Sequence, residues 1–394
     1  MKRRLAVSIL VGVIALSGSL VASAQTWVNK KVDLNIVAHQ DDDILFMNPD
    51  ILNAVKNGQR QVTVYITGGN LRPDDLNYAQ DREQGAMDGY SQLLQIADTL
   101  KVGGFSNSFT DTFSGNSRSP LTGGDSTFQC QPYKSDLTKV AGGFKWQRTQ
   151  IPIGSRLVEI ATTGDLVQGW PRVMLIFLRT NASRDVPGIP VEYNLQGEDF
   201  GPLAFANLDE LFCDPNRLCK AEWPTVIKTP DGRNTYTKQQ LLSTLVEIFK
   251  WVRPGVVRTQ DSENPFSVDG YFPGDPNQQP APYAYVIPDV GDPGNGEYYD
   301  HSDHYWGSRF AKEALRQYRL LHPDYTPTYN IYSGYNLEWT EDQNSRLMTK
   351  EYCFKKSIMY FYALNDQSAN HNEDFGTYWY WFVGYQKRVT GTLP

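Results

Sequence analysis

Residues 35–46 read NIVAHQDDDILF, with a histidine and three aspartates between two apolar segments. The residues before them, 32–38, are apolar enough to predict a strand buried in the interior of a sheet. Neighbouring carboxylates repel one another, and burying a carboxylate without a partner is costly. Two explanations remain open. Either the acids are solvated at the start of a helix, where the macrodipole stabilises them, or a positive group lies among them.

A second polar motif occurs late in the chain. Residues 298–307 read YYDHSDHYWG and hold two of the five histidines, His301 and His304, with Asp303 beside them. Imidazole and carboxylate groups are common ligands of a catalytic zinc ion, which keeps one position open for water. A cation would offset the repulsion among the aspartates, with one acid as ligand and another as base. Each motif alone is weak evidence, because a surface HxxH or a solvated helix start explains it; together they favour a metal site.

Strands and helices alternate along the rest of the chain. Further strands are predicted at 61–67, 173–179, 255–260 and 329–335, and helices at 48–58, 75–100, 237–251, 305–321 and 340–364. This alternation indicates an α/β protein with a doubly wound, mostly parallel sheet, and residues 103–128 and 262–299 predict long inserted loops. Ligands bind beyond the carboxyl ends of such strands. Residues 39–43 and 259–261 are expected there.

The N-terminus predicts export. Three basic residues at 2–4 precede the apolar run Leu5–Leu16, and Ala22-Ser23-Ala24 offers the small residues of a cleavage site. We therefore expect a signal peptide at 1–24 and one domain at 25–394, located outside the cell, in the periplasm or at the cell surface. The alternative is an uncleaved N-terminal anchor. The apolar run is short for that, since a spanning helix needs about 20 apolar residues.

Charge and cysteines narrow the class of partner. Without residues 1–24 the chain has 34 Lys and Arg against 44 Asp and Glu, a formal charge of −10. This acidity argues against binding to nucleic acid or to an anionic membrane. Export permits disulfides. Cys213 and Cys219 bracket a short loop and are predicted to pair, whereas a second bridge between Cys130 and Cys353 is possible but not fixed by spacing.

The motifs AHQDDD (38–43) and HSDH (301–304) together resemble the two signatures of the N-acetylglucosaminylphosphatidylinositol de-N-acetylase family, also called PIG-L or LmbE-like. Secondary features of that family follow in its usual order: REQGAMDGY at 82–90, PGVVRTQD at 254–261 and YSGYNL at 332–337. The resemblance covers roughly residues 32–365. It implies a Rossmann-like fold and zinc-dependent hydrolysis of an acetamido group on a sugar.

The resemblance also implies roles for residues in both motifs. The residues that match the ligands of Zn²⁺ are His39, Asp42 and His304. Asp41 matches the general base that activates water, and His301 matches the residue that stabilises the oxyanion or protonates the departing amine, with Asp303 orienting it.

The family pattern is not matched everywhere. Gln40 replaces its usual proline and Asp43 its usual glutamate, and neither change affects the ligand set. Arg82 and Tyr299 are candidates for substrate binding. For Arg82 the alternative is a structural salt bridge with Glu83 or Asp81, and for Tyr299 it is a packed loop tyrosine.

The expected function is that of a secreted zinc-dependent amidohydrolase, an N-deacetylase. It would remove the acetyl group from an N-acetylglucosamine-type sugar or glycan, or act on a related amide, without nucleic acid and without stable membrane insertion after signal cleavage. Two alternatives stay open: a carbohydrate-binding protein on the same fold without turnover, and a metal-dependent phosphoesterase.

Overall fold

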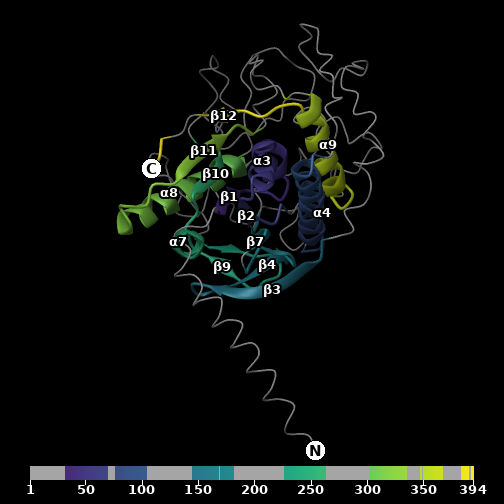
Figure 1. Ribbon diagram of the computed structural model, residues 1–394. Helices are drawn as coiled ribbons and strands as arrows, with labels where there is room; N and C mark the ends of the chain where they lie inside the picture. The colour runs from purple at the N-terminus through teal and green to yellow at the C-terminus, as the bar shows by residue number, and fades with distance from the viewer. Residues whose placement is uncertain are drawn as a thin grey trace, which may run out of the picture.

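The structure of the protein is a computed structural model (Figure 1). It describes residues 32–69, 76–103, 144–167, 169–181, 226–262, 302–334, 347, 349–366, 383–389 and 392–394. The central element is an eight-stranded sheet in the order β12-β11-β10-β1-β2-β7-β4-β3. Its strands are β1 (Val32–Val37), β2 (Arg60–Thr67), β3 (Trp146–Ile153), β4 (Arg156–Thr163), β7 (Val173–Thr180), β10 (Val256–Gln260), β11 (Thr328–Tyr332) and β12 (Arg388–Val389).

The centre of the sheet is parallel and its edges are antiparallel. β1 lies between β2 and β10 with parallel pairing on both sides, and β2–β7 and β10–β11 are also parallel. The antiparallel strands β3, β4 and β12 were not predicted. β3 is largely exposed and polar, which hides the apolar alternation that marks a half-buried strand. The prediction of a mostly parallel α/β sheet is therefore confirmed at that coarse level.

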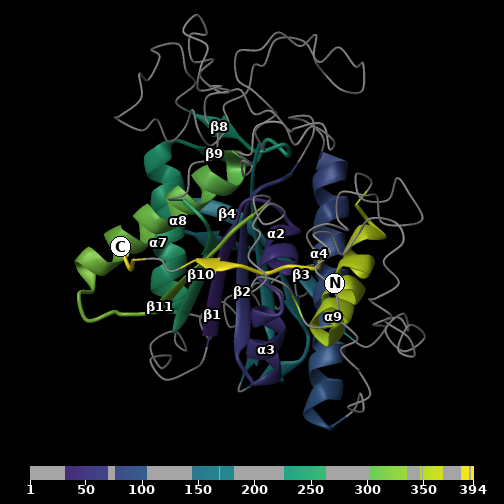
Figure 2. The ribbon, with the colours of Figure 1, turned by 90° about the horizontal axis from the view of Figure 1, so that it is seen from above.

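Helices cover both faces of the sheet (Figure 2). One face packs on α7 (Lys238–Val252) and α8 (Ser302–Leu321), and the other on α2 (Asp42–Phe46), α3 (Asp50–Lys56), α4 (Leu76–Lys101) and α9 (Thr349–Ala363). Two small ribbons stand apart from the sheet: β5 (Leu166–Val167) with β6 (Trp170–Pro171), and β8 (Ile227–Lys228) with β9 (Thr235–Tyr236).

Several helices and strands begin or end at other residues than predicted. α8 begins at Ser302, three residues before the predicted start, so that Asp303 and His304 stand in its first turn, where a carboxylate is favoured by the macrodipole. β11 ends at Tyr332 rather than 335, and the described part of the last helix begins at Thr349. α2, which was not predicted as an element, is a single short helix directly after β1.

Some sequence predictions fall outside the described residues. These include the export signal, both long loops and three of the four cysteines. Cys353, buried in α9, is disulfide-bonded, and the proposed pairings of Cys213 with Cys219 and of Cys130 with Cys353 stay predictions. Among the helices of the described residues, none combines the length and the hydropathy needed to cross a membrane.

Two glycines of α4 lie in close contact with neighbouring helices. A Cβ added at Gly85 would lie 2.7 Å from the backbone oxygen of Tyr362 in α9, and one at Gly89 would lie 3.1 Å from the Cδ1 atom of Ile44 in α2. The first neighbour is backbone that cannot turn away, whereas the second is the end of a flexible side chain. The distance between α4 and α9 therefore depends chiefly on Gly85.

Gly85→Ala should destabilise the protein by about 1–3 kcal/mol, because the new methyl group forces α9 outward. Alanine favours a helix over glycine by about 1 kcal/mol, so the sign of this change separates packing from propensity. Gly89→Ala serves as the matched control and should have a clearly smaller cost. Urea unfolding of both variants measures the difference, and a Gly85→Ala protein as stable as the wild type would contradict the packing argument.

Candidate metal centre and active site

The three aspartates lie together after the end of β1, at the start of α2. α2 begins at Asp42, directly preceded by Asp41, and each of Asp41, Asp42 and Asp43 is at most 1% exposed. The acids do stand at a helix start, as one explanation required, but they are not solvated. Each carboxylate must therefore find a partner inside the protein.

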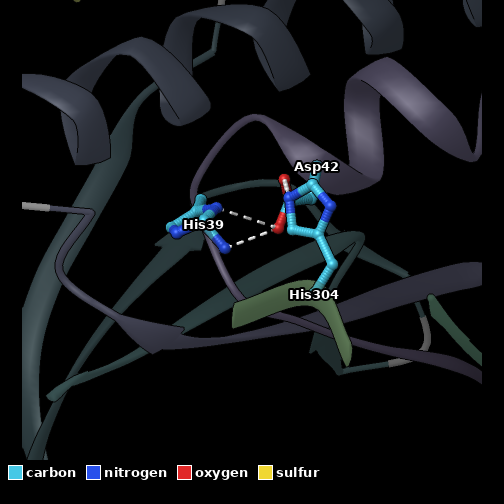
Figure 3. A group of neighbouring side chains, drawn as sticks. All are labelled: His39, Asp42 and His304. Atoms are coloured by element: carbon cyan, nitrogen blue, oxygen red, sulfur yellow. Dashed lines mark hydrogen bonds and ion pairs between the residues drawn. The ribbon is translucent and has the colours of Figure 1, made fainter. Parts of the chain in front are cut away.

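Asp42 belongs to a buried group with His39 and His304 (Figure 3). One ligand atom from each residue lies within 4.8 Å of the others. The Oδ1 atom of Asp42 is 2.9 Å from the Nε2 atom of His304. Two histidines and a carboxylate arranged in this way can hold a metal ion, and the donor set suits zinc with a position open for water.

His39 is held from both sides of its ring. Its Nδ1 atom lies 3.6 Å from Oδ2 of Asp42, and its Nε2 atom lies 3.1 Å from Oδ2 of Asp303. Burial lowers the pKa of His39, but the carboxylates of Asp42 and Asp303 outweigh burial and raise it to about 9. With the Asp303 carboxylate at Nε2, Nδ1 would be the nitrogen offered to a cation, as in metal sites where an outer carboxylate fixes the tautomer of a histidine ligand.

Asp41 pairs with Arg82 on α4. The Nη2 atom of Arg82 donates to Oδ1 of Asp41 at 2.5 Å, and its Nε atom lies 3.2 Å from Oδ2 of Asp366. Burial raises the pKa of Asp41 and the Arg82 guanidinium lowers it, with a net rise to about 6. Arg82 does form a salt bridge, but with these two acids. Its neighbour Glu83 pairs instead with Arg179, through two hydrogen bonds of 2.5 and 2.6 Å.

Asp43 points into a set of hydroxyl groups. Its carboxylate accepts hydrogen bonds from Tyr90 at 2.5 Å, from Thr63 at 2.9 Å and from Tyr65 at 3.2 Å. Burial raises the pKa of Asp43 to about 7, against the opposing effect of these hydrogen bonds. Thr63 also accepts a hydrogen bond from Asn35 of β1 at 3.0 Å, which ties Asp43 to the polar face of the central strands.

The structure thus brings together most of the residues predicted for the site: His39, Asp41, Asp42, Arg82, Asp303 and His304. His301 and Tyr299 lie outside the described residues, so their roles stay predictions. Sequence reasoning missed Tyr362 and Asp366. They lie about 280 residues beyond Arg82, and no short motif connects them to it.

Comparison with known proteins gives one weak structural likeness and no family match. No protein-family model matches the chain, and no curated protein matches it. A solved structure, the 4-carboxy-2-hydroxymuconate hydratase GalB from Pseudomonas putida KT2440, is similar with a TM-score of 0.34 and 12% sequence identity, over 89% of this chain and 82% of that one. A likeness of that strength does not establish a shared function.

His304→Ala should abolish tight binding of a divalent cation, because it removes one of three protein ligands. In the wild type, a chelator should lower the melting temperature and added zinc should restore it, since a ligand that binds the folded state stabilises it. His322→Ala, at the other end of α8, is the matched control and should keep this response. Calorimetric titration with zinc measures the affinities directly. Equal zinc affinity in both variants would exclude His304 as a ligand.

Proposed function

We propose that this protein is a secreted zinc-dependent hydrolase that removes the N-acetyl group from an N-acetylglucosamine-type sugar or glycan, or from a related amide. The observation that carries the proposal is the buried group of His39, Asp42 and His304 at the carboxyl edge of the sheet, with a further carboxylate, Asp41, beside it. The same residues match the ligands and the base of the family that the two motifs resemble.

Amide hydrolysis needs an activated water, stabilisation of charge on the carbonyl oxygen and a proton for the departing amine. A zinc ion held by the three ligands would polarise the carbonyl and bring the pKa of water towards about 7. We assign to Asp41 the role that the family resemblance implies, accepting a proton from that water. Arg82 donates to the Oδ1 atom of Asp41, so the proton would go to Oδ2.

Asp303 and His301 have separate roles in the proposal. Asp303 fixes the ring of His39 through the 3.1 Å contact with Nε2. His301, one residue before the first turn of α8, is proposed from the family resemblance to stabilise the oxyanion or to protonate the leaving amine.

The test is acetate release from N-acetylglucosamine oligomers, with N-acetylated sugar phosphates assayed in parallel for acetate and for phosphate. The proposal expects acetate release that stops with chelator and returns with zinc. Tight glycan binding without acetate release would show a binding protein. Phosphate release from the sugar phosphates, without acetate, would show a phosphoesterase.

Asp41→Asn should keep the metal and lose turnover. The substitution leaves all three ligands in place but removes the base, and general-base assistance is typically worth about 10²-fold or more. Asp98→Asn, at a surface ion pair at the far end of α4, is the control and should behave as wild type. Bound zinc and the rate of acetate release are measured on the same samples. A full rate in Asp41→Asn would mean that water is activated by another group.

A further inference from the structure

We propose that α9 is part of the catalytic apparatus: Tyr362 and Asp366, at its end, are positioning residues that hold Arg82 against Asp41. The inference rests on the proposed function, in which Asp41 is the general base. It assigns a role to two residues that neither motif contains.

Three edges of the Arg82 guanidinium are engaged at once. Its Nε atom donates to the hydroxyl of Tyr362 at 2.8 Å, its Nη1 atom to the backbone oxygen of Gly69 at 3.2 Å and its Nη2 atom to Asp41 at 2.5 Å. A guanidinium is planar and rigid, so holding Nε fixes the direction of both other nitrogens. The contact with Tyr362 therefore sets where Asp41 is held.

Asp366 also contacts the Nε atom of Arg82. Its Oδ2 atom lies 3.2 Å from the Nε atom of Arg82 and accepts a hydrogen bond from the Tyr362 hydroxyl at 2.6 Å. Its Oδ1 atom accepts a hydrogen bond from Tyr78 of α4 at 3.4 Å. Asp366 is fully buried, so its contact with Arg82 is not screened by solvent as a surface pair would be.

The backbone leaves room for this arrangement. Gly69, after β2, has a positive φ of 60°, and a Cβ there would overlap Nη1 of Arg82. Gly85 lets the backbone of Tyr362 approach α4. One glycine after β2 and one in α4 thus create the space that the guanidinium and its α9 partners fill.

This arrangement favours positioning over capture of a substrate anion. Arg82 is only 8% exposed, and two carboxylates already neutralise its single charge. An anionic group on a substrate would have to displace one of them. A fixed Arg82 has another use. It selects one orientation of the Asp41 carboxylate, and a misplacement of about 1 Å in a reacting group can cost on the order of 10²-fold in rate.

Asp366→Asn and Tyr362→Phe test the proposal, because both preserve shape. Each should lower kcat for acetate release by about tenfold or more, with KM and bound zinc unchanged. Tyr360→Phe, a more exposed tyrosine of the same helix, is the matched control and should leave kcat unchanged. Unchanged kcat in both test variants would overturn the proposal.

A double-mutant cycle separates positioning from a general effect on folding. If Asp366 acts through Arg82, Asp366→Asn should lower kcat in the wild type but not further in an Arg82→Ala background. Equal falls in both backgrounds would show that Asp366 acts independently of Arg82, and the proposal would be wrong.

The link between α9 and Arg82 is also measurable without turnover. In ¹⁵N-labelled protein the Nε–Hε signal of Arg82, assigned by its loss in Arg82→Lys, should be protected from solvent exchange. It should lose that protection in Asp366→Asn and Tyr362→Phe but keep it in Tyr360→Phe. If the wild type releases no acetate but the Arg82 signal is protected in it and loses protection in the two test variants, the proposed function is refuted and the α9 contact stands. A signal that is indifferent to both α9 variants would refute the contact itself.

Discussion

Three consecutive carboxylates buried at the end of one strand are the constraint on which this site depends. Each needs a partner inside the protein, because burying a carboxylate without one is costly. Asp41 takes Arg82, Asp42 takes the two histidines, and Asp43 takes hydroxyl groups. Successive residues of a helix point about 100° apart, so the start of α2 sends the three side chains in different directions.

That divergence connects elements that are far apart in the sequence. Asp42 reaches His304 on α8, which packs on one face of the sheet, while Asp41 reaches Arg82 on α4, which packs on the other. Arg82 in turn binds the end of α9. The short peptide after β1 is therefore the point at which helices from both faces of the sheet contact the candidate active site.

The elements that were predicted correctly are those determined by a local pattern of apolar residues. The strands that became β1, β2, β7 and β10 and the helices α4 and α7 were found by their apolar periodicity. The group of His39, Asp42 and His304 was predicted from the family resemblance of the two motifs, and the structure brings these three residues together. The partners of Arg82 and Asp43 could not be found this way. They depend on how α9 and β2 pack, and adjacent residues such as Arg82 and Glu83 face different networks on one helix. The edge strand β3 escaped prediction because an exposed strand lacks a clear apolar pattern.

Gln40 and Asp43, the two residues that differ from the motif the sequence resembles, both contact β2. Gln40, in place of proline, donates from Nε2 to the backbone oxygen of Thr67 at 3.1 Å, at the end of that strand. Asp43 is shorter than glutamate by one methylene group, and Thr63 and Tyr65 of β2 extend hydroxyls towards it, joined by Tyr90 of α4. Gln40 and Asp43 therefore both anchor the peptide after β1 to β2, beside the candidate metal group of His39, Asp42 and His304.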